Sequence, residues 1–149
     1  MSVPIGWLLF ACFCMPLSSN AQSLQSPETV SIRELCIPSK ARHAYEQGIE
    51  LLGKKDPPGS LPKFQRAIAK FPDYYEAYYR MAVAYLQLWR IADAERAYRT
   101  SIELSGERYA PPLLALGAIL DDQKKFAEAE EVTRKGLNLD PAAWTGHYY

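Results

Sequence analysis

The sequence has no net charge, and it is poor in the residue types that hold metals or form disulfides. Its 149 residues contain 17 lysines and arginines against 17 aspartates and glutamates, with three cysteines and two histidines. This balance excludes a chain that binds nucleic acid or anionic membranes mainly through overall charge. Three cysteines are too few for a disulfide scaffold, and no cysteines and histidines have the spacing of zinc ligands. We therefore predict no metal site and no nucleic-acid partner.

Residues suited to catalysis are also scarce. His43 and His147 are the only histidines, and neither lies in a motif for a metal, a nucleophile or a phosphate. The adjacent carboxylates Asp121 and Asp122 would point in different directions on a helix, which makes them a poor acid–base pair. No glycine-rich phosphate loop is present. We therefore predict a chain that is not an enzyme, with no catalytic residue and no cofactor.

The segment from Met1 to Ala21 contains no charged side chain. Residues from Val3 to Leu17 are almost entirely apolar, but this run is short for a membrane span, which needs about 20 residues. Its length fits the hydrophobic region of a secretory signal, and Ser19-Asn20-Ala21 offers a small-x-small cleavage pattern. We expect residues 1–21 to be a signal peptide that is cleaved after Ala21. The mature chain would then be exported to the periplasm or the extracellular space, with no membrane span.

Two other interpretations of this segment remain open. No lysine or arginine precedes the apolar run, so the segment could instead stay in place as an uncleaved amino-terminal anchor. A lipoprotein signal is the second alternative, but it needs a small residue two positions before the modified cysteine. Phe10 stands at that position before Cys12.

Residues 22–38 are expected to form a linker and an extended arm. Residues 22–29 are rich in serine, glutamine and proline, which is typical of a loose linker. Residues 30–37 are densely apolar without a clear period, and we expect them to pack beside the first helix. Cys36 would then be a small apolar filler, since no histidine or cysteine lies beside it to activate the thiol.

Beyond residue 38 the sequence repeats itself at a nearly fixed interval. Pro72, Gly106 and Pro141 follow one another at spacings of 34 and 35 residues. The same register aligns small residues with one another and larger residues with one another. The aligned triplets are Gly48, Ala82 and Gly117; Leu51, Tyr85 and Leu120; Ser60, Ala94 and Ala129; and Phe64, Tyr98 and Thr133. Small residues at fixed places let two helices approach closely, while larger residues fill the space between them.

This pattern resembles the tetratricopeptide repeat, a helix–turn–helix unit of about 34 residues. The resemblance covers residues 39–142 and implies an all-α fold, a right-handed superhelix of antiparallel helix pairs (a solenoid). Three units are expected at about residues 41–74, 75–109 and 110–143. Departures from the family pattern include Gln47 at a usually apolar place and Thr133 at an aromatic one. Trp89 occupies a turn place that usually holds glycine or a polar residue.

Short-range signals predict where helices begin. Asp73 has the properties of a good N-cap, and two prolines, Pro111 and Pro112, suit the first turn of a helix. The turn that starts at Asp56 places the second helix of the first unit near Ser60.

All charged side chains lie in residues 22–149, and several form acid–base pairs four residues apart. These pairs are Glu95 with Arg99, Glu130 with Arg134, and Glu131 with Lys135. We expect them on ordinary solvated helix faces, where each contributes little.

The end of the chain predicts a further, unfinished helix. Asp140 followed by Pro141 is a cap and a first-turn proline, but only eight residues follow. We expect residues 143–149 to be the start of a truncated further helix, which indicates an incomplete array or a truncated gene product. Such an end could also support self-association of the chain.

The resemblance implies a concave surface lined by the first helix of each unit, which in the family commonly holds a peptide or a partner helix. The candidate binding residues in this groove are Arg42, Tyr45, Ile49, Leu52, Glu76, Tyr79, Val83, Leu86, Leu114 and Tyr148, with Pro111, Ala118 and Asp121 in the same rows. The centre of this surface is apolar and aromatic, and its charges lie at the margins. Some of the tyrosines could instead only pack between neighbouring helices.

Chaperone-binding members of the family hold a terminal carboxylate with lysine, arginine and asparagine side chains on the inward face. The corresponding places here carry Tyr45, Ile49, Arg80, Pro111 and Ala115, so only Arg80 could contribute and this carboxylate clamp is absent. We expect an apolar or aromatic segment as the partner instead.

The sequence therefore predicts a scaffold or adaptor that binds another protein or peptide. The alternatives are a docking module of a larger enzyme or of a secretion or assembly complex, whose remainder lies beyond residue 149, and a repeat that only builds an oligomer.

Overall fold

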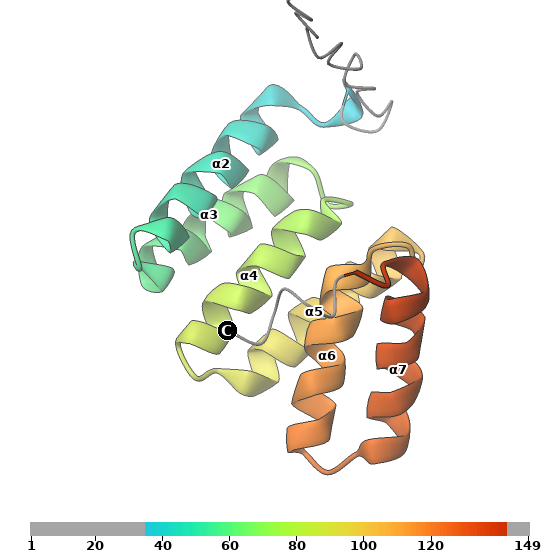
Figure 1. The fold of residues 1–149 in the computed structure, drawn as a ribbon. Helices are drawn as coiled ribbons and strands as arrows, with labels where there is room; N and C mark the ends of the chain where they lie inside the picture. The colour runs from blue at the N-terminus through green and yellow to red at the C-terminus, as the bar shows by residue number, and fades with distance from the viewer. Residues whose placement is uncertain (1–34, 143–149) are drawn as a thin grey trace, which may run out of the picture. The chain divides into compact units, whose positions relative to one another are not determined.

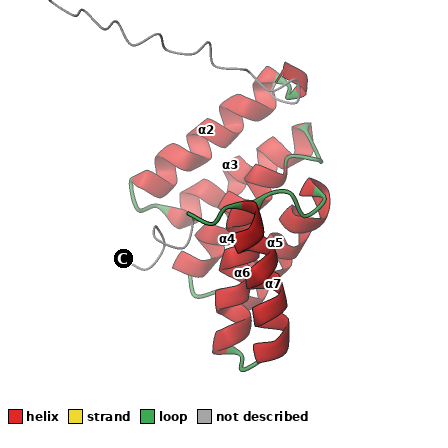
Figure 2. Ribbon diagram, turned by 45° about the vertical axis from the view of Figure 1, so that its right-hand side comes forward, coloured by secondary structure: helices red, strands yellow, loops and turns green. Residues whose placement is uncertain are grey.

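The computed structural model describes residues 35–142, and over this range the chain forms six α-helices and no strand (Figures 1 and 2). The helices are α2 (Ser39–Gly53), α3 (Pro57–Lys70), α4 (Tyr75–Gln87), α5 (Ile91–Ser105), α6 (Ala110–Asp122) and α7 (Phe126–Leu139). Each odd-numbered helix packs on the helix before it, and successive pairs meet through α3 with α4 and α5 with α6. The predicted all-α superhelix of antiparallel helix pairs is confirmed.

Several predictions made from the sequence fall outside the described residues. They concern the signal peptide at residues 1–21, the linker and arm up to residue 34, the truncated helix at residues 143–149, and Tyr148. Residues 140–142 form a turn in which the amide of Ala142 donates to the Asp140 carboxylate at 3.0 Å.

Small residues within the helix pairs lie against larger side chains, as the aligned register predicts. A Cβ atom placed on Gly48 of α2 would lie 2.5 Å from Cε1 of Phe64 on α3. A Cβ atom on Gly117 of α6 would collide with the hydroxyl oxygen of Thr133 on α7. The glycines therefore let the two helices of a pair approach to a distance that a methyl group would prevent.

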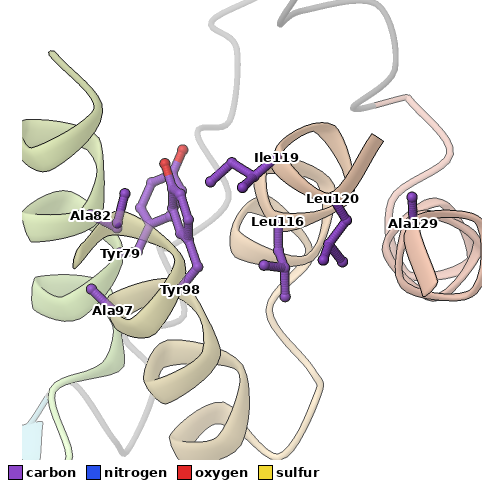
Figure 3. Close-up of a cluster of buried hydrophobic side chains, with 9 residues drawn as sticks. Tyr79, Ala82, Ala97, Tyr98, Leu116, Ile119, Leu120 and Ala129 are labelled. Atoms are coloured by element: carbon purple, nitrogen blue, oxygen red, sulfur yellow. The ribbon is translucent and has the colours of Figure 1, made fainter. Parts of the chain in front are cut away.

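The core follows the same register along the helix pairs. One cluster joins the second and third pairs, and includes Tyr79, Tyr98, Leu116 and Leu120 (Figure 3). A second cluster joins α2, α3 and the start of α4 through small side chains and Tyr74. Full burial of one large apolar side chain is worth about 1.5–3 kcal/mol, so these clusters supply most of the packing energy between helices.

The turn inside each helix pair contains one residue with a positive φ angle. These residues are Lys55, Trp89 and Lys124, with φ values of 59°, 60° and 61°. Their spacing repeats the period of the sequence, and none of them is glycine, although glycine adopts this conformation with the least strain. Trp89 is 87% exposed, so its large side chain makes little contact that would offset the strain.

Two predicted helix starts are wrong by one to three residues. Helix α3 begins at Pro57 and not near Ser60, because Asp56 acts as the N-cap and accepts a hydrogen bond from the Gly59 amide at 2.9 Å. The prolines that suggested a turn therefore occupy the first turn of the helix. Helix α4 has Tyr74 and not Asp73 at its N-cap position, because the Tyr74 carbonyl accepts the first helical hydrogen bond, from the Tyr78 amide at 3.3 Å. The Tyr74 ring is buried and packs on Tyr45.

The helix start predicted from Pro111 and Pro112 is confirmed, because α6 begins at Ala110 and has proline in its first turn.

The prediction of an extended arm at residues 30–37 is wrong at the carboxyl end of this segment. Leu35 and Cys36 are helical, and Cys36 is exposed, so this cysteine is not a buried filler. Ile37 takes the buried place instead, with 6% of its surface exposed, and packs in the cluster that contains Ala41 and Ala44. A larger aliphatic side chain gains more from this burial than a thiol does.

Charged side chains also join neighbouring helix pairs. Arg99 of α5 pairs with Glu95 at 3.0 Å, as its spacing predicts, and also with Glu128 of α7 at 2.7 Å. Gln123 at the end of α6 donates to the same Glu95 at 2.9 Å. The predicted solvated pair is therefore part of a network between the second and third pairs, which a spacing of four residues does not reveal.

Candidate binding face

The candidate binding face consists of the residues predicted on the first helix of each pair, on α2, α4 and α6. Ile49 and Arg42 are exposed, whereas Tyr79 is buried with 8% of its surface accessible. The half-buried members are Tyr45, Leu52, Glu76, Val83, Leu86, Pro111 and Leu114. Partial burial of aliphatic and aromatic side chains leaves contact area available, which suits a binding surface more than a closed core does.

Helix α6 contributes less to this face than α2 and α4. Ala118 and Asp121 are exposed, and Leu114 packs toward α7, where a Cβ atom on Gly136 would lie 2.8 Å from the Cδ2 atom of Leu114. The bulky residues Leu116 and Leu120 of the same helix are buried in the core. The apolar part of the candidate binding face is therefore carried mainly by α2 and α4.

Aromatic rings at the base of the face form two groups. Tyr45 packs on Tyr74 with ring centroids 4.9 Å apart, and on Phe64 at 6.0 Å. In the second group Tyr79 packs on Tyr109 at 5.6 Å, and it also packs on Tyr98. Figure 3 shows the rings of Tyr79 and Tyr98 next to each other, with Leu116 and Ile119 of α6 beyond them. These tyrosines thus pack between helices, as the alternative interpretation expected, and Tyr45 also keeps part of its surface exposed.

Arg80 of α4 lies between the two aromatic groups. Its guanidinium lies over the Tyr79 ring, 5.3 Å from the ring centroid, and Tyr45 and Tyr109 lie near enough to act on its charge. The Nε atom of Arg80 is buried and has no hydrogen-bond partner in the described part of the chain. A buried donor without a partner is uncommon in proteins, and here it marks a polar point within an aromatic cluster.

Burial controls the ionisation of the tyrosines around Arg80. It raises the pKa of Tyr45 and of Tyr79, and the Arg80 charge opposes this only in part. Burial also raises the pKa of Tyr98 and of Tyr109 well above the ordinary range. These phenols therefore stay neutral at physiological pH, and their hydroxyl groups can donate as well as accept hydrogen bonds.

A separate cleft of about 190 Å³ opens between α4 and α5. Its α4 wall consists of Tyr78, Met81 and Tyr85, which follow one another at spacings of three and four residues and so share a helix face. None of the candidate residues lines it. On the α5 side Asp93 forms ion pairs with both Arg90 and Arg96, so the charged groups of the cleft are already paired.

The described residues contain no group of three or more histidine, cysteine, aspartate or glutamate side chains that could hold a metal ion. None of the helices in this range is long and apolar enough to cross a membrane.

Sequence reasoning missed the roles of Tyr109 and Arg80 in the site. From the sequence, Arg80 was expected only to be the one basic residue at the positions of the carboxylate clamp. Tyr109 was expected only to end the second repeat unit. Tyr109 follows Tyr79 by a little less than one repeat, which is the signal that could have brought their rings together.

Two family models described as tetratricopeptide repeat match residues 45–111 and residues 110–142. No curated protein matches the chain in sequence.

Solved structures of similar fold include the second TPR domain of Spaghetti (RPAP3), bound to the HSP90 peptide SRMEEVD. It is 20% identical, with a TM-score of 0.64 over 68% of this chain and 94% of that one. MamA is 19% identical, with a TM-score of 0.64 over 76% of this chain and 66% of its own. The TPR domain of Arabidopsis OM64 is 20% identical, with a TM-score of 0.64 over 68% and 84% of the two chains. At these identities the likeness concerns the fold.

Proposed function

Because the chain belongs to the tetratricopeptide repeat family, we propose that it is a protein–protein interaction scaffold or adaptor that has no catalytic role of its own. Its ligand is an apolar or aromatic peptide or helix of another protein, held against the candidate binding face. The observation that carries this proposal is the row of partly exposed aliphatic side chains on α2 and α4, from Ile49 and Leu52 to Val83 and Leu86. Support also comes from two similar domains of Spaghetti (RPAP3), each of which binds an HSP90 peptide.

The chemistry of the face differs from that of a carboxylate clamp. The places that such a clamp needs carry the apolar residues Ile49, Pro111 and Ala115. Contact area therefore contributes more to affinity here than charge does, and the tyrosines supply rigid rings with neutral hydroxyl groups.

The test uses peptides selected by phage display on the purified chain, and measures their binding by fluorescence polarisation. Ile49→Glu places a charge among the apolar residues of the face and should weaken binding of the selected apolar peptides about 10-fold, the loss of a well-placed apolar contact. Leu104→Glu is a matched control, because Ile49 and Leu104 are both 37% exposed and Leu104 lies on α5.

Selected peptides that bind the Ile49→Glu variant as tightly as the parent chain would remove this face from the proposal. Failure to select any peptide, together with a chain that sediments as a stable oligomer, would favour the alternative in which the repeats only build an oligomer.

We also propose that the chain is exported, which rests on the uncharged apolar segment at residues 1–21. The measurement is the amino-terminal sequence of the protein recovered from the producing cell. A mature chain that starts at Gln22 supports export and cleavage, whereas recovery of the whole segment in a membrane fraction supports the uncleaved anchor.

A further inference from the structure

The turns inside the three helix pairs lie at one end of the pairs, and the two connections between pairs lie at the other end (Figures 1 and 2). This arrangement follows because the antiparallel pairs stack in the same orientation. We name the first end the turn edge. It consists of residues 54–56, 88–90 and 123–125, together with Ile91 and Phe126, the first residues of α5 and α7.

Three large apolar side chains of the turn edge lie in solvent. Trp89 is 87% exposed, Phe126 is 62% exposed and Ile91 is 38% exposed. Ile91 and Phe126 occupy the same place in the repeat, so this exposure recurs from one unit to the next. Large apolar side chains that gather at one end of a molecule commonly mark a surface of interaction.

The fold gives no reason for tryptophan at position 89. The φ angle of 60° lies in the left-handed region, where glycine fits with the least strain. The exposed ring also contributes little packing energy that would offset this strain. A side chain that is retained at such a cost, with so little contact, indicates a role outside the stability of the fold.

The charges at the two ends of the helix pairs differ. The turns 54–56, 88–90 and 123–125 contain five basic side chains and one acidic one, whereas the connections 71–74 and 106–109 contain one basic side chain and two acidic ones. The basic residues of the turns are Lys54, Lys55, Arg90, Lys124 and Lys125. Lys55 and Lys124 form no ion pair with another described residue, so their charges are available to a ligand.

We propose that the turn edge binds the surface of an anionic lipid membrane. Trp89, Ile91 and Phe126 insert among the lipid head groups, and the lysines lie against the lipid phosphates. Tryptophan rings favour the head-group region, and lysine keeps its charge in water while its stem contacts apolar groups. No residue of the candidate binding face belongs to the turn edge, so this proposal is independent of the proposed function.

The residue types favour a lipid surface over a protein partner. Interfaces between proteins are depleted in lysine and have a contiguous apolar core. On the turn edge the apolar side chains stand on separate turns beside basic ones, since Arg90 follows Trp89 and Lys125 precedes Phe126.

The backbone of the turns also suits insertion. The Trp89 amide donates to the Leu86 carbonyl at 2.9 Å, and the Lys124 amide donates to the Asp121 carbonyl at 2.8 Å. Insertion of these turns therefore places neither amide without a partner in an apolar surrounding, which would be costly.

Two exposed carboxylates, Asp121 and Asp122 in the last turn of α6, lie next to the third turn and oppose this attraction. A single charge near an anionic membrane changes affinity about 5-fold. The double change Asp121→Asn, Asp122→Asn should therefore strengthen binding to anionic vesicles and have no effect with uncharged ones.

The experiment follows the fluorescence of Trp89 in the full chain. Trp7→Phe and Trp144→Phe leave Trp89 as the only tryptophan. The vesicles contain phosphatidylcholine alone, or equal parts of phosphatidylcholine and phosphatidylglycerol, each with and without brominated acyl chains that quench tryptophan on contact. With anionic vesicles the emission should move to shorter wavelength and be quenched by the brominated lipid, and quenching with phosphatidylcholine alone should be several-fold weaker. Because the signal comes from Trp89 itself, insertion of residues 1–21 cannot produce it.

Matched variants test the other residues of the turn edge. Phe126→Ser should raise the amount of anionic lipid needed to quench Trp89 about 10-fold, the loss of one inserted ring. Leu139→Ser is the control, because Leu139 is 45% exposed and ends the same helix at its other end. Lys124→Gln should weaken quenching by anionic vesicles about 5-fold and leave that by phosphatidylcholine unchanged.

A second reporter tests the orientation of the bound chain. Leu104→Trp, in a chain whose other tryptophans are replaced by phenylalanine, places the reporter at the far end of α5, where brominated lipid should not quench it.

Three results would overturn the proposal. They are a Trp89 emission that no vesicle changes, equal quenching of the reporters at positions 89 and 104, and a wavelength shift that grows with protein concentration without vesicles. The last result would assign the turn edge to a second copy of the chain. None of them affects the proposed function, which is tested with peptides on the candidate binding face.

Discussion

Gly48 lies against the ring of Phe64 with no room for a methyl group. A Cβ atom at this position would lie 2.5 Å from Cε1 of Phe64, and 2.8 Å from both Cδ1 and Cζ. Carbon atoms pack best at about 3.5–4.0 Å, so the ring or the helix must move by about 1 Å to admit alanine. Phe64 is fully buried, with none of its surface exposed, so its ring has no free space into which to move.

We therefore expect Gly48→Ala to destabilise the fold. Overpacking of a core costs about 1–3 kcal/mol, while alanine in a helix interior gains up to about 1 kcal/mol over glycine. The net loss should be about 1–2 kcal/mol in the free energy of unfolding. Gly53→Ala is the matched control on the same helix, because nothing lies within 4 Å of its added Cβ atom, and it should be neutral or stabilising.

The assay is urea unfolding followed by circular dichroism, with the slope of each transition compared to confirm that the same surface unfolds. The double variant Gly48→Ala, Phe64→Leu removes the obstructing ring, so its loss should be smaller than the sum of the two single losses. Additive losses, or a Gly48→Ala chain as stable as the parent, would refute the argument that this glycine is required by the Phe64 ring.

Three further predictions concern the turns, the network between helix pairs and the buried tyrosines. Trp89→Gly should raise the unfolding free energy by about 0.5–1 kcal/mol, because glycine adopts the positive φ of this exposed turn without strain; an unchanged urea midpoint would contradict this. The pKa of Glu95 lies below its ordinary value of 4.5, first through the hydrogen bond from Gln123 and also through Arg99. Because the pKa of Glu95 is lower in the folded chain than in the unfolded chain, its ionised form stabilises the fold above about pH 4.5. This contribution is lost as the pH falls through the pKa of the folded chain. Gln123→Ala should therefore lose stability at about pH 6 but little at about pH 3, measured by urea unfolding at each pH. Burial raises the pKa of Tyr98, so its contribution is present below pH 10 and is lost as the pH rises above that value. An ultraviolet titration should show that the Tyr98 phenol ionises only when the chain unfolds. The absorbance change that accompanies unfolding should therefore be smaller in a Tyr98→Phe chain.

The fold class follows from the sequence because a repeated pattern of small and large residues is a local property of each helix pair. Gly48 and Phe64 lie on the two helices of one pair, and the same relation recurs at the same spacing between Gly117 and Thr133. Each pair can therefore be predicted from a short stretch of chain, and three copies make the pattern specific. The start of α3 is predicted wrongly because Asp56 and its prolines fit both a turn and a helix cap, and only the hydrogen bond to Gly59 separates the two.

The composition of the binding face was predictable only in part. Spacing identified Ile49, Val83 and Leu86 as members of one face, and these side chains keep exposed surface. Spacing placed Tyr79 on the same face, but its ring is buried against Tyr98 and Tyr109. Burial depends on which neighbours a side chain meets, and those neighbours lie on other helices.

The sequence by itself determined the period, the helix pairs and the apolar character of the first-helix face, because these depend on residues close together in the chain. Only the tertiary structure decided that Arg80 lies among tyrosines from different helices, and that Arg99 of α5 reaches Glu128 in the next helix pair. Such contacts depend on how one pair is rotated against the next, and a rotation of this kind is set by the summed packing of many side chains. That is why the setting of Arg80 and the Arg99 network could not be predicted from the sequence.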